Sequence, residues 1–189
     1  MNAIATQKLS WKDLIEVRVV SLKNFYSLEA GEALVVSELR RAIPRSNVRD
    51  VEVFLPAKDV GVDVLLVNLV TKRSVSIQVK ESVLYRRSRR FWFTIDEKKI
   101  NMGRRIVDFY VFVLYDMIEG SGRLSLQPRY VIVSEEAFEG RLGKKKLSGG
   151  KYHFYFRLED NKVVEERDLR IPYPEDCLDN WGLILQRAL

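Results

Sequence analysis

The chain has 189 residues, of which 47% are hydrophobic and 31% are charged, and its formal net charge at pH 7 is +6. This length and composition predict a single domain with a full apolar core and exclude an intrinsically disordered chain. No apolar run reaches the roughly 20 residues that cross a bilayer, and the N-terminal residues lack the apolar segment of a secretory signal, so we expect a cytoplasmic protein.

The single cysteine, Cys177, and the single histidine, His153, narrow the possible chemistry. One cysteine excludes an internal disulfide and a cysteine-based zinc cluster. His153 lies in the alternating segment KYHFYFRLE, which predicts a strand and contains no nucleophile elbow. Any catalysis is therefore expected to depend on carboxylates, lysine and a hard metal ion.

The first helix is predicted over residues 26–43, whereas residues 1–24 fit a short helix or a strand equally well. Ser27 is a suitable N-cap, and Pro44 ends the segment. Glu32 falls in the middle of an apolar stripe formed by Leu28, Val35, Leu39, Ala42 and Ile43. A carboxylate that points at a core needs a partner or a metal ion, although a wet helix margin or a buried arginine would also explain it.

A strand predicted within VRDVEVFL is followed by a hairpin over residues 61–80, GVDVLLVNLVTKRSVSIQVK. With its midpoint at Thr71-Lys72, a symmetric hairpin places Asp63 opposite Lys80 and Leu65 opposite Gln78. Cross-strand partners and residues two apart share one face, so Asp63, Gln78 and Lys80 are expected to converge. They predict a site for a metal ion and water, or alternatively a simple cross-strand ion pair.

The net positive charge is concentrated between residues 85 and 105, where eight bases face two acids. Aromatic residues interleave with these bases, a pattern that favours phosphate contacts combined with base stacking, although a solvated surface is the alternative. The residues that we expect to bind nucleic acid here are Tyr85, Arg86, Arg87, Arg89, Arg90, Trp92, Lys98, Lys99, Arg104 and Arg105.

The remaining elements follow from apolar periodicity and capping residues. Asp96 is expected to cap a helix over 97–106, and residues 108–115 predict a buried strand that a loop over 119–122 follows. A strand over 129–134 leads into a helix that Ser134 caps. The basic segment 141–151, with Lys144, Lys145 and Lys146, either clamps a nucleic-acid backbone or forms a solvated loop tip. A hairpin through residues 160–161 and a core-packing helix over 175–189 complete the chain.

This order of elements resembles the PD-(D/E)XK nuclease superfamily, whose members have the restriction-endonuclease-like fold. The residues that show the resemblance are GEALVVSELRRAI, VEVF, GVDVLLV and SIQVK. The Gln-x-Lys ending is similar to that of the Mrr-like and Holliday-junction-resolvase-like branches. The resemblance implies an α/β fold with an αβββαβ core and a mixed central sheet flanked by helices, over roughly residues 26–134. A C-terminal hairpin and helix would extend the same domain over residues 135–189.

The resemblance also implies roles for individual residues. Asp63, Gln78, the backbone carbonyl of Val79 and Glu32 would hold Mg²⁺ or Mn²⁺. Lys80 would orient the attacking water and stabilise charge on the phosphate. Val62 replaces the usual proline, and Gln78 replaces the usual acid, which removes one negative charge from the metal site.

These observations predict a metal-dependent nuclease that hydrolyses DNA phosphodiester bonds. Fold-level analogy with the junction and duplex cutters of this fold adds a homodimer as one option. The alternative is a catalytically weak or inactive module with a nuclease-like fold that binds nucleic acid. A third hypothesis is an interaction protein whose basic patch binds an acidic protein partner.

Overall fold

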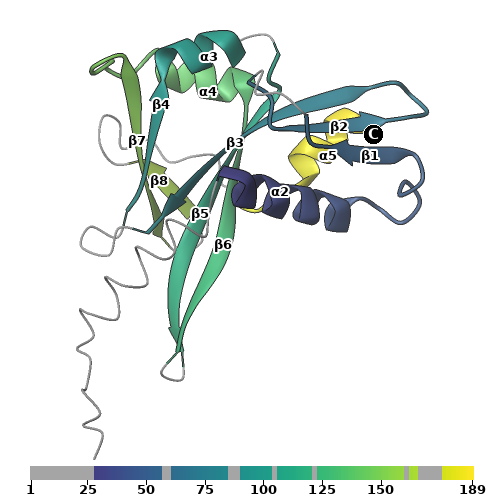
Figure 1. Cartoon of the computed structure of the whole chain (residues 1–189), viewed down its shortest axis with the longest axis horizontal. Coiled ribbons are helices and arrows are strands. Elements are labelled where there is room, and N and C mark those ends of the chain that lie inside the picture. Colours follow the sequence, from purple (N-terminus) through teal and green to yellow (C-terminus); the bar gives the residue numbers. More distant parts are fainter. Residues whose placement is uncertain are drawn as a thin grey trace, which may run out of the picture.

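The computed structural model describes residues 28–56, 61–84, 90–103, 106–120, 123–159, 162–165 and 176–189. Within them the chain forms an α/β protein with one mixed, strongly curled sheet, one small antiparallel sheet and few helices (Figure 1). The larger sheet has the strand order β1-β2-β3-β5-β6, with bounds Val51–Phe54, Val64–Asn68, Ser74–Val83, Phe109–Gly120 and Arg123–Ser134. The smaller sheet has the order β4-β7-β8, with bounds Phe91–Asp96, Lys151–Glu159 and Lys162–Glu165. The helices are α2 (Leu28–Ala42), α3 (Glu97–Gly103), α4 (Glu135–Leu142) and α5 (Gly182–Ala188).

The predicted hairpin is present as β2 and β3, but its register differs from the prediction. Leu65 pairs with Ser76 rather than with Gln78. The turn begins at Asn68, whose side-chain Oδ1 accepts hydrogen bonds from the backbone N–H groups of Val70 and Thr71, both at 3.0 Å. This side chain fixes a four-residue loop and moves the centre of the hairpin towards the N-terminus. The register changes by two positions, so each side chain stays on its predicted face.

Parallel pairing of β3 with β5 joins the hairpin to the second half of the sheet. Gln78 lies beside Tyr110, and Lys80 lies beside Phe112, both on the strand that the apolar run 108–115 predicts. Asp108 stabilises this junction, because its Oδ2 accepts from the backbone N–H of Ser76 at 2.8 Å. Its Oδ1 forms a 2.8 Å ion pair with Arg187 of α5, which attaches the C-terminal helix to the junction.

Three predicted boundaries are wrong. Strands β5 and β6 form one long hairpin that includes residues 119 and 120, and β6 begins at Arg123 rather than at 129. Pro128 argues against a strand in the sequence, yet it is tolerated because β6 is an edge strand. The C-terminal helix begins at Gly182 rather than at 175, because Leu178 forms a bridge to Val131 of β6.

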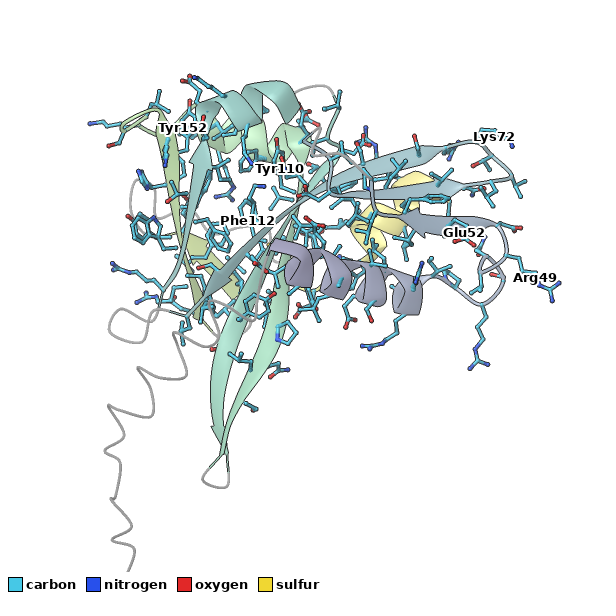
Figure 2. All side chains as sticks on the ribbon, in the orientation of Figure 1. Arg49, Glu52, Lys72, Tyr110, Phe112 and Tyr152 are labelled. Carbon is cyan, nitrogen blue, oxygen red and sulfur yellow. The ribbon has the colours of Figure 1, made fainter. Side chains whose placement is uncertain are left out.

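The small sheet was not predicted as a unit. The basic aromatic run contains β4, which pairs antiparallel with β7 and makes the C-terminal hairpin part of a three-stranded sheet. This sheet packs over one face of the larger sheet, and Figure 2 shows Tyr110 and Phe112 between the two. The opposite face packs against α2 and α5 through Val35, Leu39 and Ile184. No helix in the described residues is both long and apolar enough to span a bilayer.

Candidate metal and nucleic-acid site

The site begins where β2 starts beside the middle of β3. Asp63 immediately precedes β2, and its Oδ2 accepts hydrogen bonds from the backbone N–H of Val79 at 2.7 Å and from Gln78 Nε2 at 3.3 Å. Both hydrogen bonds that the described residues make to this carboxylate end on Oδ2. The carboxylate thus faces β3 at the position that the sequence predicts for the metal-binding residues.

Lys80 is directed to the same point. Its Nζ donates to the carbonyl oxygen of Val79 at 3.0 Å. In an extended strand the N–H and C=O of one residue point towards the same neighbouring strand, so both backbone groups of Val79 point towards the start of β2. The structure therefore brings Asp63, Gln78, Val79 and Lys80 together. Gln78 is buried and Lys80 is partly exposed, which leaves the lysine end of the site open to solvent.

Glu32 comes from the second turn of α2, which packs on the other face of the sheet, and its residue is partly exposed. Its neighbour Gly31 approaches β3 closely, because a Cβ at position 31 would lie 2.7 Å from Glu81 Oε2. Glu81 follows Lys80 directly in the chain. Glu32 therefore directly follows the helix residue that approaches β3, and this approach occurs at Glu81, one position after Lys80.

Glu81 itself was not singled out from the sequence. Its carboxylate accepts from the Tyr115 hydroxyl at 2.9 Å and from the backbone N–H of Gly31. Burial raises the pKa of Glu81 above its usual value, and these two hydrogen bonds oppose part of that increase. Glu81 therefore joins the start of α2, the helix that carries Glu32, to β3 and β5.

Comparison of the chain with protein-family models, curated proteins and solved structures finds no match. The chemistry of the site is therefore argued from its own residues.

The oxygen donors gathered at the start of β2 are suited to a hard divalent cation. A carboxylate, a side-chain amide oxygen and a backbone carbonyl are ligand types that bind Mg²⁺ or Mn²⁺, with water completing the coordination. Within the described residues, no group of three or more acidic, histidine or cysteine side chains is arranged to hold a metal ion. Because Gln78 is neutral, Asp63 is the one charged ligand among the three grouped at β3, and we expect weak metal affinity.

The predicted nucleic-acid contacts fall into two groups. The structure does not describe Tyr85, Arg86, Arg87, Arg89, Arg104 or Arg105. It places Arg90 and Trp92 on exposed positions at the start of β4, and Lys98 and Lys99 on exposed positions of α3. Lys144 and Lys146 are exposed in the turn that precedes β7. That turn meets the start of α3, since the backbone N–H of Glu97 donates to the carbonyl of Gly150 at 3.0 Å.

The prediction that Lys145 of the basic segment 141–151 binds nucleic acid is wrong. Its ammonium is buried, forms an ion pair with the fully buried Glu165 and donates to the carbonyl of His153 at 2.9 Å. It also lies 4.5 Å from the centroid of the Phe154 ring. Lys145 is therefore a structural residue that neutralises a buried carboxylate, not a surface contact for phosphate. The sequence has three consecutive lysines here, and no local pattern distinguishes the buried middle one from its neighbours.

Proposed function

We propose that the protein is a metal-dependent nuclease that hydrolyses DNA phosphodiester bonds at the site formed by Asp63, Gln78, Val79 and Lys80. The observation that supports this most is the convergence of the Asp63 carboxylate and the Lys80 ammonium on the two backbone groups of Val79. A simple cross-strand ion pair would not require a carboxylate and an ammonium to bind the two backbone groups of one residue next to an amide side chain. The order of helix, antiparallel hairpins and parallel strand also agrees with the resemblance to the PD-(D/E)XK nucleases.

The residues of the site would divide the chemistry between them. Asp63, Gln78 and the carbonyl of Val79 would hold Mg²⁺ or Mn²⁺, with Glu32 reached directly or through water. When bound, the cation would supply Lewis-acid activation of water and neutralisation of phosphate charge. The Val79 N–H holds the Asp63 carboxylate in place, and the Lys80 ammonium would orient the attacking water and stabilise negative charge on the phosphate.

The test is cleavage of linear duplex, branched and single-stranded DNA with Mg²⁺, with Mn²⁺ and with a chelator. Asp63→Ala and Lys80→Ala should each lower the cleavage rate by roughly 100-fold or more. Glu52→Ala on β1 and Lys72→Ala at the tip of the β2–β3 hairpin are matched controls, since both residues are exposed and distant from the site (Figure 2). Cleavage that survives both site substitutions would end the assignment.

A second candidate is a module with the same fold that binds nucleic acid without cleaving it. Two observations favour it: Lys80 Nζ donates to the carbonyl that a metal would use, and Gln78 supplies no negative charge. Isothermal titration calorimetry separates the two candidates. Divalent-ion binding that Asp63→Ala removes supports the nuclease, whereas DNA binding with a steep salt dependence and no divalent-ion binding supports the binding module.

A further inference from the structure

The small sheet has two chemically different faces. In β4 and β7, Phe91, Phe93, Phe154 and Phe156 point inward and form the core beneath the sheet. The alternate positions point outward, where no described element packs over the exposed Trp92 and Thr94. The solvent-facing side of an antiparallel sheet usually carries polar residues, whereas the inner side is apolar. This face instead presents large aromatic rings.

The rings on the outer face are held in a fixed arrangement. Trp92 pairs across the strands with Tyr155, and their rings are nearly parallel, with an interplanar angle of 8° and centroids 5.9 Å apart. The His153 ring lies 6.0 Å from the Trp92 ring, and Trp92 Nε1 donates to His153 Nδ1 at 3.4 Å. Despite these contacts, 47% of Trp92 remains exposed. A tryptophan that is both ordered and half exposed offers a flat surface to a ligand.

Basic residues surround the rings on the same face. The register assigns Lys151, Arg157 and Lys162 to it, together with Asp96 and Glu159. Arg90, which immediately precedes β4, is exposed. Arg157 and Glu159 form an ion pair. The four bases exceed the two acids, so the local charge is positive and favours a polyanion.

We propose that the outer face of β4-β7-β8 binds single-stranded nucleic acid, with unpaired bases stacked on Trp92 and Tyr155 and phosphates held by the surrounding basic residues. Aromatic rings on an open sheet can stack on bases only where these are not already paired and stacked in a duplex. The positive charge favours a nucleic acid over an apolar peptide. The chemistry of stacking is shared by DNA and RNA, and the experiment below distinguishes them.

The face is physically connected to the candidate metal site. Ser82 Oγ donates to the backbone carbonyl of Trp92 at 2.9 Å and accepts from its backbone N–H at 3.1 Å. Ser82 lies two residues beyond Lys80 on β3, on the same face of that strand, which is about 7 Å along the strand. Under the proposed nuclease function, on which this link rests, the outer face would hold an unpaired segment of the substrate beside the cleavage site.

Binding is measured by fluorescence anisotropy of labelled 15-nucleotide oligo-dT and oligo-rU and of a 15-base-pair DNA duplex, with a chelator present so that no cleavage occurs. We expect tighter binding of a single strand than of the duplex. Trp92→Leu and Tyr155→Leu keep apolar bulk but remove the flat ring, and each should weaken single-strand binding by roughly five- to 150-fold. Phe54→Leu, which changes an equally exposed aromatic residue on β1, should leave affinity unchanged.

Two further readouts separate stacking from charge. Binding should quench tryptophan fluorescence in the unmodified protein, and Trp92→Phe should lose that quenching. Arg90→Ala should reduce the slope of log affinity against log salt by about 0.7. Thermal melting of each variant near that of the unmodified protein shows that the fold is kept, which the exposure of Trp92 leads us to expect.

Equal binding of single strands and duplex, or an unchanged affinity in Trp92→Leu, would overturn the proposal. Tighter binding of oligo-rU or of oligo-dT supports it and identifies the sugar that is preferred. The nuclease proposal is tested separately, because Asp63→Ala should abolish cleavage and preserve oligonucleotide binding. Binding that depends on Trp92 in a protein that cleaves nothing would support this inference and contradict the nuclease.

Discussion

The amide of Gln78 would determine how strongly the proposed metal site attracts a cation. In the structure Gln78 Nε2 donates to Asp63 Oδ2. This contact joins a neutral amide to a negative carboxylate, so it is stable without a metal. A glutamate at this position would place two carboxylates in contact, which is unfavourable unless a cation lies between them. In the proposed site, Gln78 is therefore compatible with the metal-free state, whereas a glutamate at this position would need a bound metal.

Gln78→Glu should increase metal affinity on the order of tenfold, because ligand charge is the main determinant of affinity at oxygen sites. At saturating Mn²⁺ the variant should gain about 1.4 kcal/mol more stabilisation than the unmodified protein. Thermal melting with Mn²⁺ and with a chelator measures this difference. Gln127→Glu, at an exposed position of β6, is the matched control. An equal response of both variants to Mn²⁺ would contradict metal binding at Gln78.

Glu81 predicts a pH dependence whose sign follows from its environment. Burial raises its pKa in the folded protein, so its contribution to stability is fully present below the usual pKa of a glutamate and is lost as pH rises through the raised value. Glu81→Gln stays neutral and can still accept from Tyr115 and Gly31. The variant should therefore gain stability relative to the unmodified protein between about pH 4 and pH 7. Urea unfolding across this range measures it, with Glu52→Gln as the exposed control; a difference that shrinks with rising pH would contradict it.

At the scale of single elements, the β2–β3 turn shows what the sequence contained and what it concealed. The alternation of apolar residues predicts both strands, and Asn68 is a turn-forming residue whose Asx bonds set the loop. A midpoint chosen by symmetry ignores that side chain and misplaces the register. Likewise, FWFTID alternates as a strand does, but the arginine-rich segment that contains it predicts a binding surface rather than a strand.

Lys72 adopts a left-handed conformation in this turn, with φ of 62°. A side chain is strained there and glycine is not, so Lys72→Gly should stabilise the protein by up to about 1 kcal/mol. Val70→Gly is the matched control, because Val70 is exposed in the same turn and has no positive φ, so glycine should lower stability there. Urea unfolding of the two variants gives both signs. Equal destabilisation would show that the turn has another conformation in solution.

At the scale of the whole molecule, two cores share the central sheet, and the sequence predicts one of them well. The core between α2, α5 and the sheet follows from helical stripes and strand alternation, which are local patterns. The second core depends on β4 pairing with β7, some 60 residues later in the chain, and no local pattern specifies that pairing. The same limit applies to Lys145, which lies in the turn before β7, whereas its buried partner Glu165 lies on β8. The proximity of Asp63, Gln78 and Lys80 could be predicted because all three lie within one hairpin.

Cys177 allows the integrity of the second core to be measured. It is the only cysteine of the chain and is buried in that core, where burial raises the pKa of its thiol to about 11. Because the thiolate is the reactive form, the folded protein should react with iodoacetamide at pH 8 far more slowly than an exposed cysteine does. Ser125→Cys in a Cys177→Ala background supplies that exposed control on β6. Labelling of Cys177 should rise in urea together with the loss of circular dichroism if the two cores unfold as one unit. Labelling that precedes that loss would show that the small sheet opens alone.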